Sequence, residues 1–227
     1  GITAFPDTRF VHLYGATETA PIITGLADEV ELIDHDRGRS AGQPVMGCQV
    51  VIREPDGSPA PVGRPGEVTI RGANVMSGYW NKPEQTAAAL RGGWYRSGDV
   101  GQVDEEGYLF LLDRSKDMII SGGENVYCTE VEDALYTHPA VLEATVFGIP
   151  DDRWGEAVHA VVVLRDGAPA DVDAAALIAH CRPLIAGYKL PRSVEFRAEP
   201  LPKSGPGKVL KRQLREPFWE GRDGAIG

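Results

Sequence analysis

The hydrophobic and polar positions of this chain alternate in short runs, which predict a protein of mixed α and β structure. Short apolar runs bounded by glycine, proline or acidic turns are typical of strands. Pro55-Asp56-Gly57 is a turn signal between two of them. Strands are expected at Phe10–Tyr14, Val50–Ile52, Glu67–Ile70, Tyr108–Leu112, Val141–Gly148, Ala157–Leu164 and Ser193–Arg197.

Helices are expected between some of these strands. Gln85–Leu90 follows Asn81–Glu84, which supplies capping residues and a proline at the start. Thr129 and Glu132 have the spacing of a capping box, so a helix is expected to begin there. A further helix is expected at Ala174–Arg182.

The pattern changes at Asp113–Asp117, where five polar residues in succession separate two apolar strands. The chain before this segment is rich in strands. After it, the predicted order is strand, helix, strand, strand, helix, strand. We therefore predict residues 1–113 to be a β-rich piece of a larger domain and residues 114–227 to be a compact α+β domain.

Composition and charge exclude several classes of protein. The 227 residues carry a net charge of −10, which disfavours binding to nucleic acid or to an anionic membrane surface. No apolar run is long enough to span a bilayer, and the first residues do not form a signal peptide. The chain begins at Gly1 rather than Met, so it is expected to start inside a longer protein. Three cysteines and five histidines lack the spacing of a disulfide framework or zinc site, which favours a reducing, cytoplasmic setting.

A first cluster of candidate chemistry follows the Phe10–Tyr14 strand. Gly15 allows the backbone to approach a ligand closely, and Thr17 and Glu18 come directly afterwards. A hydroxyl can donate to a phosphate oxygen while a carboxylate balances its Mg²⁺. The alternative is a strand-to-helix turn in which Thr17 and Thr19 act as caps.

A second candidate is Asp99, a carboxylate that follows a glycine and the aromatic pair Trp94-Tyr95. A carboxylate can accept hydrogen bonds from both hydroxyls of a ribose. The alternative is an aspartate in a turn beside buried aromatic side chains.

Two polar segments follow the predicted boundary. Arg114 offers a planar guanidinium to hydroxyls or phosphate. Gly122 and Gly123, followed by Glu124, allow a tight turn or the close approach of a ligand. The alternative is a solvated linker followed by a simple hairpin turn.

A fourth candidate is Lys208, at the end of a loop rich in glycine, proline and serine. Between Lys203 and Arg215 there are five cations and no acidic residue. A lysine on such a loop can move into a site and neutralise developing negative charge. The alternative is a basic, mobile tail. The GxxxxGK[ST] phosphate loop is excluded because Val209 follows Lys208.

In their order along the chain, these segments resemble the adenylate-forming superfamily, which includes acyl-CoA synthetases, luciferases and the adenylation domains of peptide synthetases. The similar stretches are Tyr14–Glu18, Gly66–Val68 through Gly78–Trp80, Tyr95–Asp99, Gly107–Glu132, Gly187–Pro191 and Pro202–Lys208. The resemblance implies the C-terminal part of a large adenylating domain, residues 1–113, followed by a small mobile domain, residues 114–227. It also implies ATP, Mg²⁺ and coenzyme A as reactants.

The resemblance also implies roles for individual residues. Tyr14 would pack on adenine, Thr17 would contact the phosphate of the adenylate, and Glu18 would hold Mg²⁺. Asp99 and Arg114 would bind the ribose hydroxyls. The implied nucleotide-binding set is Tyr14, Gly15, Ala16, Thr17, Asp99 and Arg114.

In the second domain, Lys208 would contact the carboxylate and α-phosphate during adenylation, and with Thr17 and Glu18 it forms the implied catalytic set. Lys116 falls at the hinge position, where many members have aspartate. Rotation about this hinge would replace Lys208 by Gly122, Gly123 and Glu124, which would line the pantetheine tunnel. Cys128 stands where the family commonly has proline.

The resemblance favours an ATP-dependent carboxylate–CoA ligase, with a fatty acid as the expected substrate. The family's upstream phosphate loop is not among these residues, so the chain is expected to need the missing N-terminal portion of the same protein and to be inactive alone. The alternatives are an acyl-adenylate ligase that loads a carrier protein and a non-catalytic binding module. As an isolated module, the chain would need a homo-oligomer or a swapped strand to cover the edge of Phe10–Tyr14.

Overall fold

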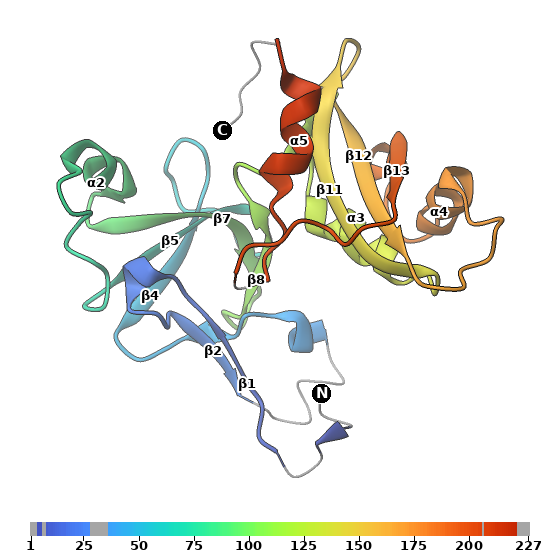
Figure 1. The fold of residues 1–227 in the computed structure, drawn as a ribbon. Helices are drawn as coiled ribbons and strands as arrows, with labels where there is room; N and C mark the ends of the chain where they lie inside the picture. The colour runs from blue at the N-terminus through green and yellow to red at the C-terminus, as the bar shows by residue number, and fades with distance from the viewer. Residues whose placement is uncertain (1–3, 6–7, 28–35, 206, 222–227) are drawn as a thin grey trace. The chain divides into compact units, whose positions relative to one another are not determined.

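The computed structural model describes residues 4–5, 8–27, 36–205 and 207–221. The chain divides into two compact units, Gly1–Ser115 and Lys116–Gly227 (Figure 1). The predicted mixture of α and β structure is confirmed in both. The assignment of residues 1–113 to a large adenylating domain and of residues 114–227 to a mobile domain stays a prediction.

The first unit contains two antiparallel sheets. The smaller sheet has the order β1-β2-β3, and the larger has the order β4-β5-β7-β6, with β8 paired to β7. The strands are β1 (Val11–Tyr14), β2 (Thr24–Ala27), β3 (Gln43–Pro44), β4 (Cys48–Arg53), β5 (Gly66–Gly72), β6 (Leu90–Arg91), β7 (Trp94–Val103) and β8 (Leu109–Arg114). The helices are α2 (Pro83–Ala89) and the 3₁₀ turns Thr17–Thr19 and Asp36–Arg39.

A single apolar cluster joins the two sheets of the first unit. Ile23, which precedes β2, packs with Val68 and Ile70 of β5, and all three are fully buried. A backbone hydrogen bond joins two further members of this cluster, since Ala41 N–H donates to Leu109 O of β8 at 2.7 Å. Strand β1, at the position of the predicted strand Phe10–Tyr14, pairs with β2 and is held to the larger sheet through Ile23 and Ala41.

The second unit is a mixed sheet with helices on both faces. Its strand order is β10-β9-β12-β11, and β13 pairs with β12 in parallel. The strands are β9 (Ile119–Ser121), β10 (Glu124–Val126), β11 (Val141–Asp151), β12 (Gly155–Leu164) and β13 (Ser193–Arg197). The helices are α3 (Cys128–Tyr136), α4 (Ala174–Cys181), α5 (Lys211–Trp219) and the 3₁₀ turn Gly187–Lys189.

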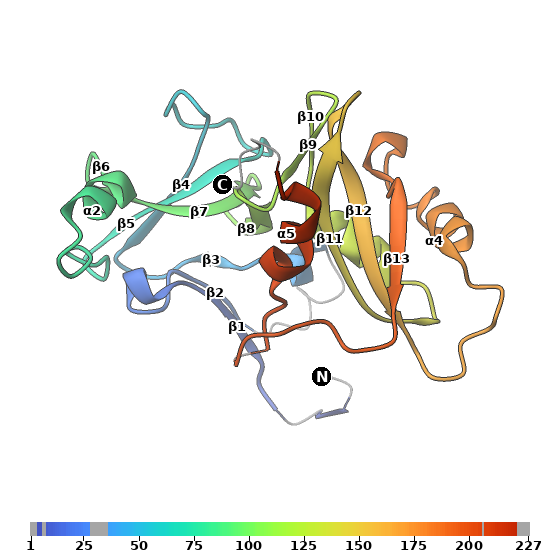
Figure 2. The ribbon, with the colours of Figure 1, turned by 45° about the horizontal axis from the view of Figure 1, so that its top comes forward.

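Alternate side chains of β11 and β12 point to opposite faces of this sheet, as the pleat requires. Ala144 and Val146 join the cluster formed with α3 and α4, whereas Phe147 joins a second cluster with Leu201 and Leu214. Helix α5 lies along β11 in both views of the fold (Figures 1 and 2). The sheet is therefore covered on one face by α3 and α4 and on the other by the C-terminal segment.

Two details of the sequence interpretation are corrected here. The capping box is wrong, because α3 begins at Cys128, which places Thr129 inside the helix, and the N-cap residue Tyr127 makes no side-chain capping hydrogen bond. Glu132 instead accepts a hydrogen bond from Val146 N–H at 2.7 Å. The segment after Lys208 is not a mobile tail, since α5 buries Leu214 and Trp219.

None of the helices in the described ranges combines the length and apolar character needed to cross a lipid bilayer.

Candidate nucleotide and acyl-transfer site

The backbone turns sharply where β1 ends, because Gly15 lies against the returning chain. A Cβ atom at Gly15 would stand 1.5 Å from the carbonyl oxygen of Pro21, so no other residue fits there. Ile23 N–H donates to Tyr14 O at 2.8 Å and closes this turn. The close approach fixes Tyr14 and the residues after Gly15 in space.

Three side chains from different strands meet beyond this turn. The Tyr14 hydroxyl donates to Asp99 Oδ2 at 2.6 Å, and Arg114 Nε lies 3.4 Å from Asp99 Oδ1. Asp99 and Arg114 face each other because the register of β7 and β8 pairs them directly. The structure thus brings together three of the residues expected to contact the nucleotide.

The hydroxyl of Tyr14 is held in its neutral, donating form. Burial raises the pKa of Tyr14 above its ordinary value, and the hydrogen bond to Asp99 raises it further. Asp99 is supported from its own backbone, because its N–H donates to Ser97 Oγ at 3.0 Å. A carboxylate with one oxygen near tyrosine and the other near arginine is well placed to accept hydrogen bonds from neighbouring hydroxyl groups.

Thr17 and Glu18 lie on the 3₁₀ turn that follows. Thr19 is the residue that stabilises this turn, since its hydroxyl donates to Ala16 O and accepts from Ala16 N–H. Thr17 is exposed and Glu18 is half-buried. Of the two threonines proposed as caps, the structure therefore assigns the capping contacts to Thr19.

Glu18 is oriented by Tyr79, a residue to which the sequence interpretation gave no role. The Tyr79 hydroxyl donates to Glu18 Oε1 at 2.9 Å. Burial is the main cause that raises the pKa of Tyr79, and this hydrogen bond raises it further. The sequence offered one signal for Tyr79, its place in the family-like stretch Gly78–Trp80. Its contact with Glu18 could not be predicted, because the two residues are 61 positions apart and share no local pattern.

Glu18 fits a magnesium ion that takes most of its ligands from elsewhere. Within the described part of the chain, no group of three or more histidine, cysteine or acidic side chains could hold a metal. Mg²⁺ typically uses one or two protein carboxylates and completes its shell with water and phosphate oxygens. A single oriented carboxylate is consistent with that arrangement.

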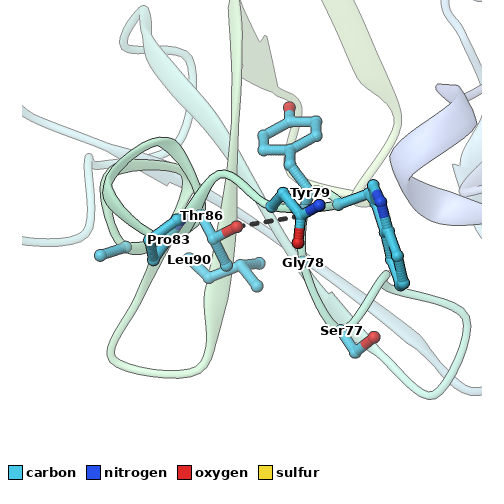
Figure 3. A pocket seen from close by; sticks show the side chains of 9 residues that line it. Ser77, Gly78, Tyr79, Pro83, Thr86 and Leu90 are labelled. Atoms are coloured by element: carbon cyan, nitrogen blue, oxygen red, sulfur yellow. Dashed lines mark hydrogen bonds between the residues drawn. The ribbon is translucent and has the colours of Figure 1, made fainter.

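A hollow of about 520 Å³ lies next to Tyr79 (Figure 3). Thr86 lines this hollow, and its hydroxyl accepts from Tyr79 N–H at 2.9 Å. Trp80 is 89% exposed at its rim. The lining residues are Ser77, Gly78, Tyr79, Trp80, Asn81, Pro83, Thr86, Ala87 and Leu90.

In the second unit, Gly122 and Gly123 form the turn between β9 and β10, as the hairpin alternative expected. Both have positive φ, 63° and 86°. Gly122 N–H donates to Trp154 O at 2.8 Å, and a Cβ at Gly122 would stand 2.7 Å from the Trp154 ring. Glu124 follows as an exposed residue at the start of β10. The glycine turn is thus fitted against Trp154.

Lys208 lies on the outgoing side of a small hairpin, with an exposed side chain. Ser204 N–H donates to Lys208 O at 2.8 Å, and Lys203 and Val209 form an isolated β-bridge. Lys116, the residue expected at the hinge, is exposed at the start of the second unit. The implied site residues therefore fall in both units, with the nucleotide set in the first and Lys208 and Gly122–Glu124 in the second.

The first unit has two sheets and a tyrosine–aspartate–arginine cluster, and the second has a sheet with a lysine hairpin. These are features of an adenylate-forming enzyme. Comparison with known proteins supports this class. Residues 2–80 match the family of AMP-binding enzymes, and residues 130–208 match the AMP-binding enzyme C-terminal domain.

Among curated relatives, a feruloyl-CoA synthase of an Amycolatopsis species is 49% identical over 92% of this chain and 41% of its own length. A long-chain-fatty-acid–CoA ligase of Yersinia pestis is 44% identical over 89% of this chain and 35% of its own length. The chain thus spans about two fifths of the length of these relatives.

A solved structure of o-succinylbenzoate CoA synthetase from Bacillus subtilis, in complex with its acyl-adenylate intermediate, matches with a TM-score of 0.82. It is 40% identical, over 90% of this chain and 40% of that one. A second structure of the same synthetase holds ATP and a magnesium ion and matches with a TM-score of 0.81, at 39% identity over 91% of this chain and 41% of that one. The chain belongs to the adenylate-forming superfamily, among the relatives of acyl-CoA ligases.

Proposed function

We propose that this chain forms the ribose-binding edge and the mobile domain of an ATP-dependent carboxylate–CoA ligase that works through an acyl-adenylate. The observation that supports the proposal most directly is the cluster of Tyr14, Asp99 and Arg114. It combines a neutral phenol, a carboxylate and a guanidinium on rigid strands, which suits a ribose next to a phosphate.

In the first half-reaction, a carboxylate oxygen of the acid attacks the α-phosphorus of ATP, and pyrophosphate leaves. Asp99 and Arg114 would hold the ribose while Thr17 donates to the phosphate. Lys208 would contact both the acid's carboxylate and the α-phosphate, where negative charge accumulates. Mg²⁺ would neutralise phosphate charge when bound, with Glu18 as its carboxylate ligand.

In the second half-reaction, the thiolate of coenzyme A attacks the acyl carbon, and AMP leaves. Rotation of the second unit about Lys116 would withdraw Lys208 and present the turn of Gly122, Gly123 and Glu124 to pantetheine. A turn built from two glycines at positive φ offers little side-chain bulk, so a narrow thiol arm can pass close to its backbone.

The acid is proposed to be a fatty or aromatic carboxylic acid. This range follows from the relatives, which are named for feruloyl, succinylbenzoate and long-chain fatty acyl substrates. The 227 residues alone are proposed not to adenylate, because they contain no Ser/Thr/Gly-rich loop to orient the β- and γ-phosphates.

The assignment of Lys208 is tested in the longest natural form of the protein that contains this chain. Lys208→Ala should greatly slow acid-dependent pyrophosphate exchange, to a low but measurable rate, while leaving thioester formation from preformed acyl-adenylate close to normal. Arg212→Ala is the matched control, because Arg212 lies nearby with its side chain 82% exposed. Equal loss of both half-reactions in Lys208→Ala would contradict the assignment.

A further inference from the structure

The hairpin that carries Lys208 is attached to the sheet of the second unit on both sides of that lysine. Leu201 is 3% exposed before the hairpin, and Val209 and Leu214 pack after it against Phe147 of β11. These apolar contacts place the segment on the sheet. They are not directional, so they do not by themselves fix the register of the hairpin.

A glutamate of β11 holds the incoming leg. Glu143 Oε2 accepts from Leu201 N–H at 2.8 Å, and Oε1 pairs with Lys203 Nζ. The hydrogen bond from Lys203 is the main cause that lowers the pKa of Glu143, and the hydrogen bond from Leu201 N–H lowers it further. This carboxylate is therefore charged at neutral pH. Glu143 follows a register shift in the β11–β12 ladder, and irregularities of this kind redirect side chains.

A second glutamate, from α3, holds the outgoing leg. Glu132 Oε1 accepts from Val146 N–H at 2.7 Å and lies 2.8 Å from the Nζ of Lys211, the first residue of α5. The side chains of Glu132 and Lys211 are only 16% and 19% exposed. Burial raises the pKa of Glu132, and Lys211 is the main group that opposes this effect. One carboxylate thus joins α3, the outer strand β11 and the start of α5.

We infer that Glu132 and Glu143 are positioning residues for Lys208. Glu143 pairs with Lys203, before Lys208 in the chain, and Glu132 pairs with Lys211, after it. Each carboxylate also accepts a hydrogen bond from a backbone N–H. The hairpin is therefore held at one register, and Lys208 would move as part of the rigid second unit when that unit rotates. This inference rests on the proposed role of Lys208 in adenylation.

Glu132→Gln and Glu143→Gln in the longest natural form of the protein test the inference. Glutamine keeps the size of the side chain and a carbonyl that can accept the backbone N–H, but it loses the charge that holds the lysine. The kcat of acid-dependent pyrophosphate exchange should fall roughly tenfold or more, because misplacing a catalytic group by about 1 Å is that costly. Thioester formation from preformed acyl-adenylate should change less than about twofold.

Glu130→Gln is the matched control. Glu130 also lies on α3 and also pairs with a lysine, since Lys189 Nζ is 2.6 Å from Glu130 Oε2. Its lysine partner belongs to the 3₁₀ turn Gly187–Lys189 and not to the Lys208 hairpin, so pyrophosphate exchange should be unchanged. Thermal unfolding of all three variants reports their stability. Should either positioning variant unfold, Lys203→Met and Lys211→Met remove the same pairs from the other side and must give the same selective loss.

Double variants that combine each glutamine substitution with Lys208→Ala test whether the loss of adenylation arises through Lys208. If the glutamates act through Lys208, neither glutamine substitution should slow adenylation further in a Lys208→Ala background. An additive loss there, or an equal fall of both half-reactions, would overturn the positioning role. If Lys208→Ala itself has no selective effect on adenylation, the proposed role of Lys208 fails as well.

Discussion

Three polar side chains of the first unit form the proposed ribose-binding cluster. Tyr14, Asp99 and Arg114 are far apart in sequence, yet one strand register and one glycine turn bring their polar atoms together. Each contact in the cluster is directional, so the contribution of each hydroxyl or charge can be measured separately.

Tyr14→Phe should weaken AMP binding by the longest natural form about tenfold or more. The phenol donates to a carboxylate at 2.6 Å, and hydrogen bonds to charged groups contribute about 1.5–3 kcal/mol. Isothermal titration with AMP measures the change. Tyr136→Phe is the matched control, because it removes a tyrosine hydroxyl whose partner is Ala144 O in the second unit. Unchanged affinity in Tyr14→Phe would show that the hydroxyl does not position Asp99.

His159 should make the stability of the chain depend on pH. It is 5% exposed, its Nδ1 pairs with Ser193 Oγ at 2.7 Å, and its ring packs against Phe147 and Phe218. Burial lowers the pKa of His159, and Glu195 opposes this only in part. The unfolded chain therefore binds this proton more readily, so stability is present above the ordinary pKa of about 6.5 and is lost as pH falls below it.

Urea unfolding of the 227-residue chain between about pH 5 and 7.5 measures this effect. The wild type should lose stability as the pH falls, and His159→Gln should show a shallower dependence. Identical slopes for the two proteins would mean that His159 does not contribute.

At the scale of elements, the β9–β10 turn shows how a glycine can be required for two different reasons. Gly122 and Gly123 both have positive φ, which costs other residues about 1–2 kcal/mol. A Cβ at Gly122 would also displace the Trp154 ring, whereas a Cβ at Gly123 would meet nothing within 4 Å.

Gly122→Ala should therefore destabilise the protein more than Gly123→Ala, which pays the backbone cost alone. Thermal or urea unfolding of the two variants makes the comparison. Because the proposed pantetheine path runs beside this turn, Gly122→Ala should also slow thioester formation more than adenylation. Equal stability of the two variants would mean that Trp154 shifts without cost.

The elements most easily predicted from the sequence are those whose apolar pattern matches their packing. β13 was expected at Ser193–Arg197 and lies there. β7 is not evident from the sequence because its ten residues include the polar Arg96, Ser97 and Asp99. Their side chains form hydrogen bonds to residues of β5 and β1. α5 was missed because a run of cations conceals the buried Leu214 and Trp219.

The capping box failed for a related reason. Glu132 has the correct spacing for a cap, but its carboxylate is taken by the N–H of Val146 and by Lys211. Local spacing cannot reveal partners that lie on a later strand and on the last helix. The candidate residues Asp99 and Arg114 could be chosen from the sequence, whereas Tyr79 required the fold.

At the scale of the whole molecule, the proposed domain rotation requires two compact units, and the chain passes from one to the other between Ser115 and Lys116. Lys116→Pro should slow overall acyl-CoA formation below the rate of either half-reaction measured separately. Proline fixes its own φ and restricts Ser115 before it, which limits rotation at that point. Lys116→Ala is the control and should retain overall turnover. Normal turnover in Lys116→Pro would place the hinge elsewhere.

The most direct test of the central claim is pyrophosphate release by the longest natural form of the protein, with ATP, Mg²⁺ and a panel of fatty and aromatic acids, with and without coenzyme A. The 227-residue chain is assayed in parallel. We expect acid-dependent release with acyl-CoA as product from the long form, and none from the 227-residue chain. Release without acyl-CoA would contradict the choice of acceptor, and the absence of release with every acid would contradict the proposed ligase activity.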